Sequence, residues 1–221
     1  KEKYDLDYIL LIVPQPTNLL DGVQVMSLGT VGKIMPAIIV QGKKGHAGHC
    51  YEGFSALSVI SDIYQRTNGS LEFSDIYEDE ATVPPTWANL RDMKESYDVS
   101  IPHRAYGYFT VFAFDSTPDD IMGKLKKICI ESIENQVKKL DGEYQEYKKI
   151  NKSERKEKIY YEPVVMSFNE LCDTIRAKDR AGFEKFYEDT YKDAVAKVNS
   201  GESNFPSATI DVMEAVLDYS G

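Results

Sequence analysis

Two of the three histidines in this chain lie in one glycine-rich segment, and there the sequence first points to chemistry. A β-branched run at residues 38–40 ends at Gly42, and Lys-Lys-Gly-His-Ala-Gly follows, with His46 and His49 three positions apart. A strand, a tight turn and a helix beginning near Gly53 would direct the His46 imidazole away from the local core. Such an imidazole can donate a hydrogen bond, transfer a proton or bind a metal.

The residues alone leave two interpretations of His46 open. In the simpler one, the side chain caps its own turn by hydrogen-bonding the backbone, and in the other it serves a reaction. Histidines three residues apart bind a metal when they lie on a helix, but the intervening Ala-Gly favours a turn and no third ligand is evident. The chain contains no His-x-Asp, no His-Glu-x-x-His and no adjacent Glu-Glu pair. We therefore expect no metal site in this chain.

A second candidate group is His103-Arg104, which follows Pro102 and opens the clearest strand pattern in the sequence. An ion pair at the edge of a sheet is the simple explanation for this arginine. A guanidinium group also forms paired hydrogen bonds with a carboxylate, and this property predicts recognition of a carboxylated substrate.

Composition limits the classes of function. The chain has 221 residues and a formal net charge of −10, which would repel phosphates over most of the surface, so we expect no nucleic-acid partner. No apolar run approaches the roughly 20 residues of a membrane span. The apolar run at residues 8–13 has strand length and follows acidic residues, unlike a signal peptide. With three widely spaced cysteines and no Cys-x-x-Cys, we expect a cytoplasmic protein without membrane contact.

The order of the predicted elements indicates an α+β fold. Between residues 31 and 168 the patterns read strand, helix, strand, strand, helix, strand, which is the ferredoxin-like split βαβ arrangement: an antiparallel four-stranded sheet with two helices on one face. The strands are expected at residues 31–41, 87–92, 103–115 and 159–168, and the helices at 53–66 and 116–149. Another strand is expected at residues 5–13, and a helical extension from residue 169 onward. The opposite face of such a sheet would need cover from a partner or a second domain.

Several of these segments together resemble a known domain. Gly29-Thr-Val-Gly32, the turn from Gly42 to Gly48 and the helix that starts with Gly53 are similar to the lid, or dimerisation, domain of dinuclear-zinc metallopeptidases of the aminoacylase and carboxypeptidase G type. Within that superfamily, Pro84-Pro85-Thr86, Leu90-Arg91-Asp92 and the stretch from Tyr97 to Ala105 resemble the arginine-utilisation (RocB) group. The resemblance covers residues 5–170.

The resemblance implies a homodimer in which His46 reaches the active site of the other subunit and donates a hydrogen bond to the oxyanion. The zinc ions and the glutamate base would belong to a catalytic domain flanking the lid in sequence. The substrate would be a peptide or an amino-acid derivative. This chain departs from the family in two respects. At the end of the strand at residues 7–13, where the family has an acidic zinc ligand, this chain has Val13-Pro14 or, with another placement of the gap, Gln15-Pro16-Thr17. Residues 109–114 lack the arginine that binds the substrate carboxylate in the family, which leaves Arg104 as a substitute.

The sequence therefore predicts three parts: a remnant catalytic-domain strand at residues 1–28, a lid at 29–168 and a helical extension at 169–221. The expected function is that of a lid domain, inactive alone, in which His46 is catalytic and Arg104 with His103 binds a substrate carboxylate. The chain is interpreted as an excised lid in preference to a degenerate relative. The alternative function is a ferredoxin-like regulatory module that binds a small amino acid at a dimer interface.

Overall fold

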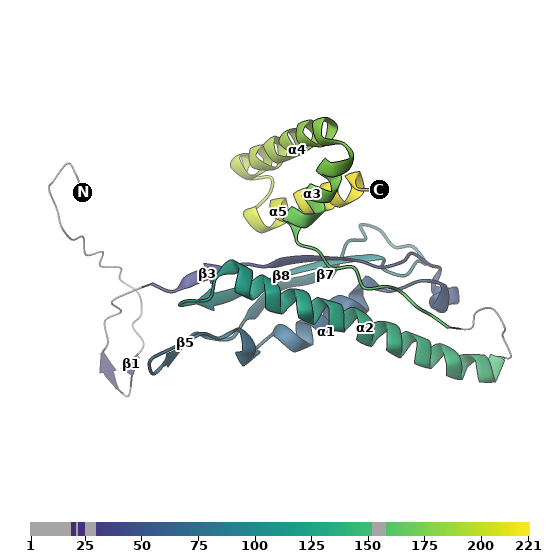
Figure 1. Cartoon of the computed structure of the whole chain (residues 1–221), viewed down its shortest axis with the longest axis horizontal. Coiled ribbons are helices and arrows are strands. Elements are labelled where there is room, and N and C mark those ends of the chain that lie inside the picture. Colours follow the sequence, from purple (N-terminus) through teal and green to yellow (C-terminus); the bar gives the residue numbers. More distant parts are fainter. Residues whose placement is uncertain (1–18, 21, 25–29, 152–157) are drawn as a thin grey trace. The chain divides into compact units, whose positions relative to one another are not determined.

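The structure is a computed structural model that describes residues 19–20, 22–24, 30–151 and 158–221 (Figure 1). The chain divides into two units, residues 1–30 and 31–221, and each is described by itself. In the first unit, β1 (Leu19–Leu20) pairs antiparallel with β2 (Val23–Gln24). The strand predicted at residues 5–13 lies outside the described residues, and so does most of the predicted part at 1–28.

The second unit is an α+β structure whose antiparallel sheet has four strands arranged around β8 (Arg104–Ala113). β3 (Gly32–Ile34) and β4 (Ala37–Gln41) follow one another along one side of β8, and β7 (Thr86–Asp92) pairs with the other side. The strand predicted at residues 31–41 is thus interrupted at Pro36, because proline has no N–H to donate to the ladder. β8 is therefore the central strand of the sheet.

Two helices cover one face of this sheet. Alternate residues of β8 from Ala105 to Ala113 are buried, and they form one core with the apolar stripes of α1 (Ala56–Thr67) and α2 (Pro118–Asn151). Both helices lie where the sequence predicts them, and Figure 1 shows them on the same face. The loops between α1 and β7 contain a short 3-10 helix, η3 (Leu71–Phe73), and the hairpin of β5 (Ile76–Tyr77) with β6 (Glu80–Ala81).

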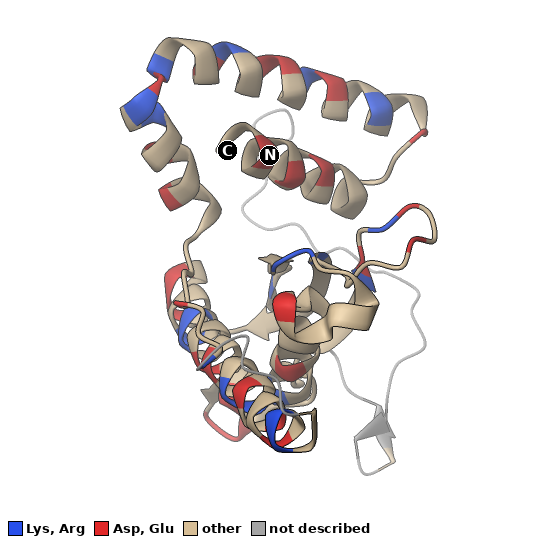
Figure 2. Ribbon diagram, turned by 90° about the vertical axis from the view of Figure 1, so that its right-hand side faces the viewer, with Lys and Arg blue, Asp and Glu red and all other residues tan. Residues whose placement is uncertain are grey.

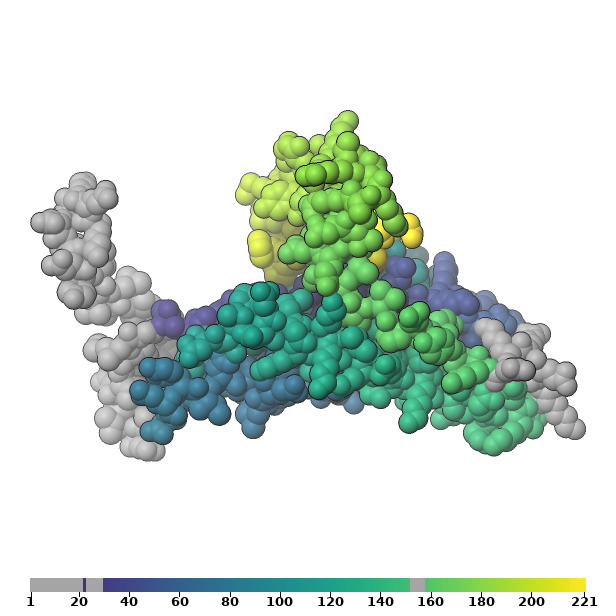
Figure 3. Space-filling model, viewed as in Figure 1, coloured from purple at the N-terminus to yellow at the C-terminus, as the bar shows by residue number. Residues whose placement is uncertain are grey.

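The strand predicted at residues 159–168 was wrong. Residues 158–167 form no strand, although their side chains alternate as in one: Ile159 is buried and Tyr160 is exposed. Pro163 interrupts the run of backbone donors, and the N–H of Ile159 donates to the carboxylate of Asp141 at 2.8 Å instead of to a strand. In Figure 3 this green segment lies along the teal surface of α2. The fourth strand of the sheet is therefore β3, and the described residues do not complete the predicted split βαβ arrangement.

The predicted helical extension is present as three helices, α3 (Phe168–Lys178), α4 (Arg180–Ser200) and α5 (Phe205–Tyr219). Ser167 and Glu170 form a capping box at the start of α3, and Gly201 ends α4 with a φ of 80°. The bundle has its own apolar clusters, and α5 contacts β4. It lies on the face of the sheet opposite α1 and α2 (Figure 1). The boundaries proposed at residues 28/29 and 168/169 stay predictions.

Candidate functional site

The glycine-rich segment forms a loop between β4 and α1 that is held by backbone hydrogen bonds on two sides. Lys43 and Phe54 exchange a pair of these bonds, at 2.9 and 2.8 Å, across the base of the loop. On the other side, the N–H of Ala47 donates to the carbonyl of Val99 at 2.8 Å, and His46 pairs with Ser100. The connection between β7 and β8 therefore braces the histidine turn.

The glycines of this loop allow the close approach of its two sides. A Cβ atom at Gly42 would lie 2.1 Å from the carbonyl oxygen of Phe54, and one at Gly53 would lie 2.5 Å from Cδ1 of Ile101. A Cβ atom at Gly45 would lie 3.0 Å from the backbone of Gly53. Steric exclusion of a side chain thus explains why glycine occurs at these positions.

His46 is exposed at the start of the 3-10 helix η2 (Ala47–Glu52), where its Nδ1 accepts a hydrogen bond of 3.0 Å from the N–H of Gly48. A neutral imidazole that accepts at Nδ1 carries its hydrogen on Nε2. Among the described residues Nε2 has no hydrogen-bond partner. The capping interpretation is therefore correct, and capping leaves a fixed N–H donor facing solvent. His49 lies beside it, with ring centroids 5.9 Å apart.

The brace beneath His46 depends on a lysine that the sequence reasoning missed. Nζ of Lys94 donates to the carbonyl oxygens of Asp98 and Ser100, at 3.1 and 3.0 Å, and forms an ion pair with the Asp98 carboxylate. Hydrogen bonds from Lys94 and then Ser100 lower the pKa of Asp98. These contacts close the loop that holds Val99 and Ser100 against the histidine turn. The available signal was the spacing of four residues between Lys94 and Asp98.

His103 and Arg104 lie where this loop enters β8, close to the base of the histidine turn. The carbonyl of His103 accepts a hydrogen bond of 2.7 Å from the N–H of Gly42, so the backbone joins the two predicted groups. Nδ1 of His103 is buried without a hydrogen-bond partner within the described part of the chain. Burial, followed by the positive charges of Arg104 and Lys44, lowers the pKa of His103. Both effects favour the neutral form of this imidazole.

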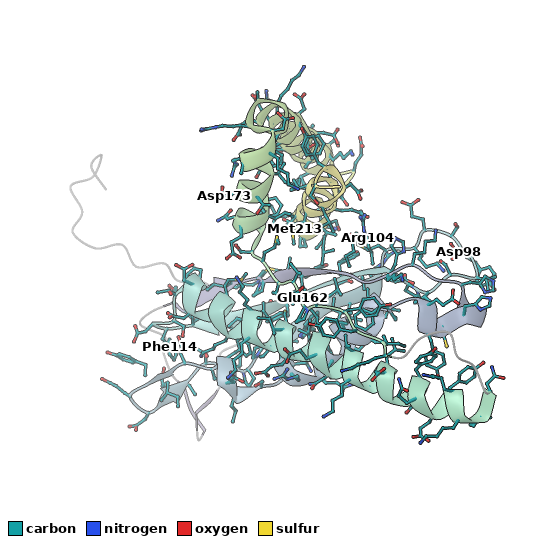
Figure 4. All side chains as sticks on the ribbon, turned by 45° about the vertical axis from the view of Figure 1, so that its right-hand side comes forward. Asp98, Arg104, Phe114, Glu162, Asp173 and Met213 are labelled. Carbon is teal, nitrogen blue, oxygen red and sulfur yellow. The ribbon has the colours of Figure 1, made fainter. Side chains whose placement is uncertain are left out.

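The Arg104 guanidinium binds carboxylates, as its chemistry predicts, but both carboxylates belong to this chain. Its Nη1 lies 2.6 Å from Asp218 Oδ1 and 3.5 Å from Glu214 Oε1, both on α5. Its Nε donates to Oε1 of Gln41 at 3.1 Å. Figure 4 labels Arg104 between the sheet and the bundle, with Met213 of α5 to its left. Sequence reasoning did not find the two carboxylates, because more than 100 residues separate them from Arg104.

Metal-binding and membrane-spanning features were also sought. Within the described ranges, no group of three or more His, Cys, Asp or Glu side chains is placed to hold a metal ion. None of the helices found there combines the length and apolar character that crossing a bilayer requires. Cys129 is buried, and burial raises the pKa of its thiol to about 12, whereas Cys50 is exposed.

Comparison with known proteins identifies two relatives from Bacillus subtilis (strain 168). Protein RocB is 30% identical over 135 residues, which are 60% of this chain and 24% of RocB. The uncharacterized protein YqjN is 27% identical over 168 residues, which are 75% of this chain and 29% of YqjN. The similarity fits the RocB group. No family model matches the chain, and the chain spans less than a third of the length of these relatives.

Proposed function

We propose that this chain is the lid and dimerisation domain of a zinc-dependent amidohydrolase or peptidase of the arginine-utilisation (RocB) type. In this proposal the lid is of the ferredoxin-like type. The observation in favour is that β4, α1 and β7 form a βαβ unit whose two strands are separated by the antiparallel β8. The similarity to RocB covers 60% of this chain, and the similarity to YqjN covers 75%.

The geometry of His46 carries the proposal. Its Nδ1 is held by the backbone, its Nε2 faces solvent as a donor, and the turn beneath it is fixed by hydrogen bonds from two loops. A donor fixed before the reaction stabilises a developing oxyanion at little reorganisation cost. His46 is exposed, and the family resemblance implies that the oxyanion would form in the active site of the second subunit of a homodimer.

Zinc is implied by the resemblance, and the residues described here do not fit a zinc site. We therefore assign no step to a metal held by this part of the chain. In the proposal, zinc belongs to a catalytic domain elsewhere in the protein, where it would supply the activated water for amide hydrolysis. The contribution of this chain is the His46 donor and, through Arg104 and His103, recognition of a substrate carboxylate.

The test replaces His46 with alanine in the complete protein that contains this chain. Loss of one oxyanion donor should lower kcat by about 10²–10³-fold, while the zinc content measured by atomic emission stays at the wild-type level. His49→Ala is the matched control, because His49 is equally exposed and its ring lies beside that of His46. Equal kcat values for the two variants would remove His46 from the mechanism.

Two measurements on the 221-residue chain address its other proposed properties. Light scattering during gel filtration should give the mass of a dimer, and a monomer at all concentrations would contradict the dimerisation role. A thermal-shift screen against free amino acids should show no stabilisation. A clear stabilisation by one amino acid would instead favour the alternative, a regulatory module with an amino-acid site.

A further inference from the structure

The carboxylate-binding group of the proposed site is already occupied by the chain's own carboxylates. Arg104 is 19% exposed at its side chain, whereas Asp218, its nearer partner at 2.6 Å, is 59% exposed. Glu214 makes a second and longer contact of 3.5 Å. The guanidinium is therefore held in position by the sheet and Gln41, while the carboxylate opposite it lies at a rim that small solutes can reach.

The carboxylates are on a part of the chain with a core of its own. Apolar residues of α3, α4 and α5 pack with each other around Phe183 and around Ala194, separately from the core beneath the sheet. The bundle meets the rest of this unit where α5 contacts β4. In addition, an ion pair of 2.9 Å joins Lys126 of α2 to Glu170 at the start of α3. An exposed ion pair of this kind contributes little. Release from the Arg104 end of the sheet would therefore remove the packing of α5 on β4 and leave α5 held by α3 and α4.

The charge of α5 suits this role. Its three charged residues, Asp211, Glu214 and Asp218, are all acidic (Figure 2). When a dissolved carboxylate replaces Asp218 at Arg104, one charge-assisted contact is exchanged for another of the same kind. The equilibrium between the closed and open forms then depends on the remaining packing of α5 on β4. A ligand shifts this equilibrium only through its higher affinity for the open form.

We propose that α5 is a carboxylate-sensitive gate: Asp218 and Glu214 occupy Arg104 until the carboxylate of a substrate displaces them and releases the α3–α5 bundle from this end of the sheet. The proposal rests on the proposed function, because it assigns Arg104 to the substrate carboxylate. It adds that access to Arg104 is controlled by the chain itself and that substrates without a carboxylate do not open the gate.

The experiment uses the 221-residue chain with N-acetylglycine as the probe and N-acetylglycinamide, its uncharged analogue, as the control ligand. Binding is followed by NMR titration, and opening is followed by hydrogen exchange of the α5 amides. Saturating N-acetylglycine should accelerate exchange in α5 of the wild-type chain, and the amide should not. In the variant Asp218→Asn/Glu214→Gln the probe should bind about fivefold more tightly, because the competing carboxylates are gone.

Two further variants separate a gate from a structural ion pair. Arg104→Lys keeps the charge but loses the planar fork, and should lose most of the probe binding. Asp173→Asn/Glu184→Gln is the matched control. It removes both carboxylates from Arg176, which lie 3.0 and 2.8 Å from that guanidinium inside the bundle, and it should leave probe affinity unchanged. If the Asp218→Asn/Glu214→Gln variant unfolds, the single variant Asp218→Asn is measured in its place.

The proposal is overturned if N-acetylglycine binds the wild-type chain and the Asp218→Asn/Glu214→Gln variant equally, or if α5 exchange is the same with and without the probe. Absence of probe binding in every variant also overturns it. These outcomes are independent of the His46 experiment. A gate that fails while His46→Ala still lowers turnover leaves the lid function standing, and the reverse result rejects the lid function while retaining a carboxylate site.

Discussion

Replacement of Gly42 by alanine tests the architecture that positions His46. The added Cβ would lie 2.1 Å from the carbonyl oxygen of Phe54 and 3.2 Å from the amide nitrogen of Ala56. Both atoms are backbone, so neither can rotate away as a flexible side chain does. The two sides of the loop must separate, and the hydrogen bonds that join them must lengthen or break.

The cost follows from the bonds at risk. Gly42 donates to His103 at 2.7 Å, and Lys43 and Phe54 exchange bonds of 2.9 and 2.8 Å. At about 1 kcal/mol for each bond, we expect the free energy of unfolding to fall by about 2–3 kcal/mol. For a domain of this size the melting temperature should then decrease by roughly 5–10 °C. Because His46 follows this base, its donor should also lose its fixed position.

Fluorescence of Trp87 during urea denaturation is a suitable assay. It is the single tryptophan of the chain, and on β7 it stacks on Phe109 with ring centroids 4.8 Å apart, so it reports unfolding of the sheet. Gly123→Ala is the matched control. No atom lies within 4 Å of a Cβ built at this position of α2, and alanine there should stabilise the helix by up to about 1 kcal/mol. A Gly42→Ala chain within about 0.5 kcal/mol of wild type would refute the described loop.

Two further predictions concern the described core and its border. The Asp75 carboxylate accepts hydrogen bonds from three consecutive backbone N–H groups and a serine hydroxyl at the start of α2. Burial alone would raise the pKa of Asp75, but these bonds outweigh it and lower the pKa. The stability that the charged form contributes is therefore complete above the unfolded pKa of about 4 and is lost as the pH falls through the lower folded value. We expect Asp75→Asn to cost about 1–2 kcal/mol at pH 7 after solvent screening, and equal pH profiles of unfolding would contradict this. In native protein, a thiol reagent should modify exposed Cys50 quickly and Cys129 only after unfolding, because burial raises the Cys129 pKa to about 12. Rapid modification of both thiols would show that the face of α2 that carries Cys129 is not packed into the core.

The sequence patterns predicted most elements because each rests on local chemistry. The alternation in β8 and the apolar stripe of α1 identify the buried faces directly. Residues 158–167 show the limit of this reasoning. Alternating apolar residues indicate which side chains face inward, but a strand also needs hydrogen bonds to the backbone of a neighbouring strand. Here Pro163 lacks an N–H, and the N–H of Ile159 donates to Asp141, so the segment does not pair with the sheet.

The contacts of the candidate site residues were predicted only in part. His103 and Arg104 were expected near a ligand, and the bond between Gly42 and His103 joins them to the histidine turn. The pairing of Arg104 with α5 has no local signature, because ion pairs between distant segments depend on how two separately folded parts meet. Lys94 has a detectable spacing to Asp98, yet its role in bracing His46 follows only from the loop conformation.

The two interpretations of His46 are compatible, because the proposed oxyanion role uses the ring position that capping provides. An exposed histidine without a local bond would exchange its hydrogen between both ring nitrogens and rotate freely. The bond from Gly48 to Nδ1 removes both freedoms, since it selects the form with hydrogen on Nε2 and fixes the ring. The same bond that caps the turn at Gly48 therefore leaves the Nε2 hydrogen of His46 free for the proposed oxyanion. Capping and catalysis use opposite ends of the same imidazole, so evidence for the first does not count against the second.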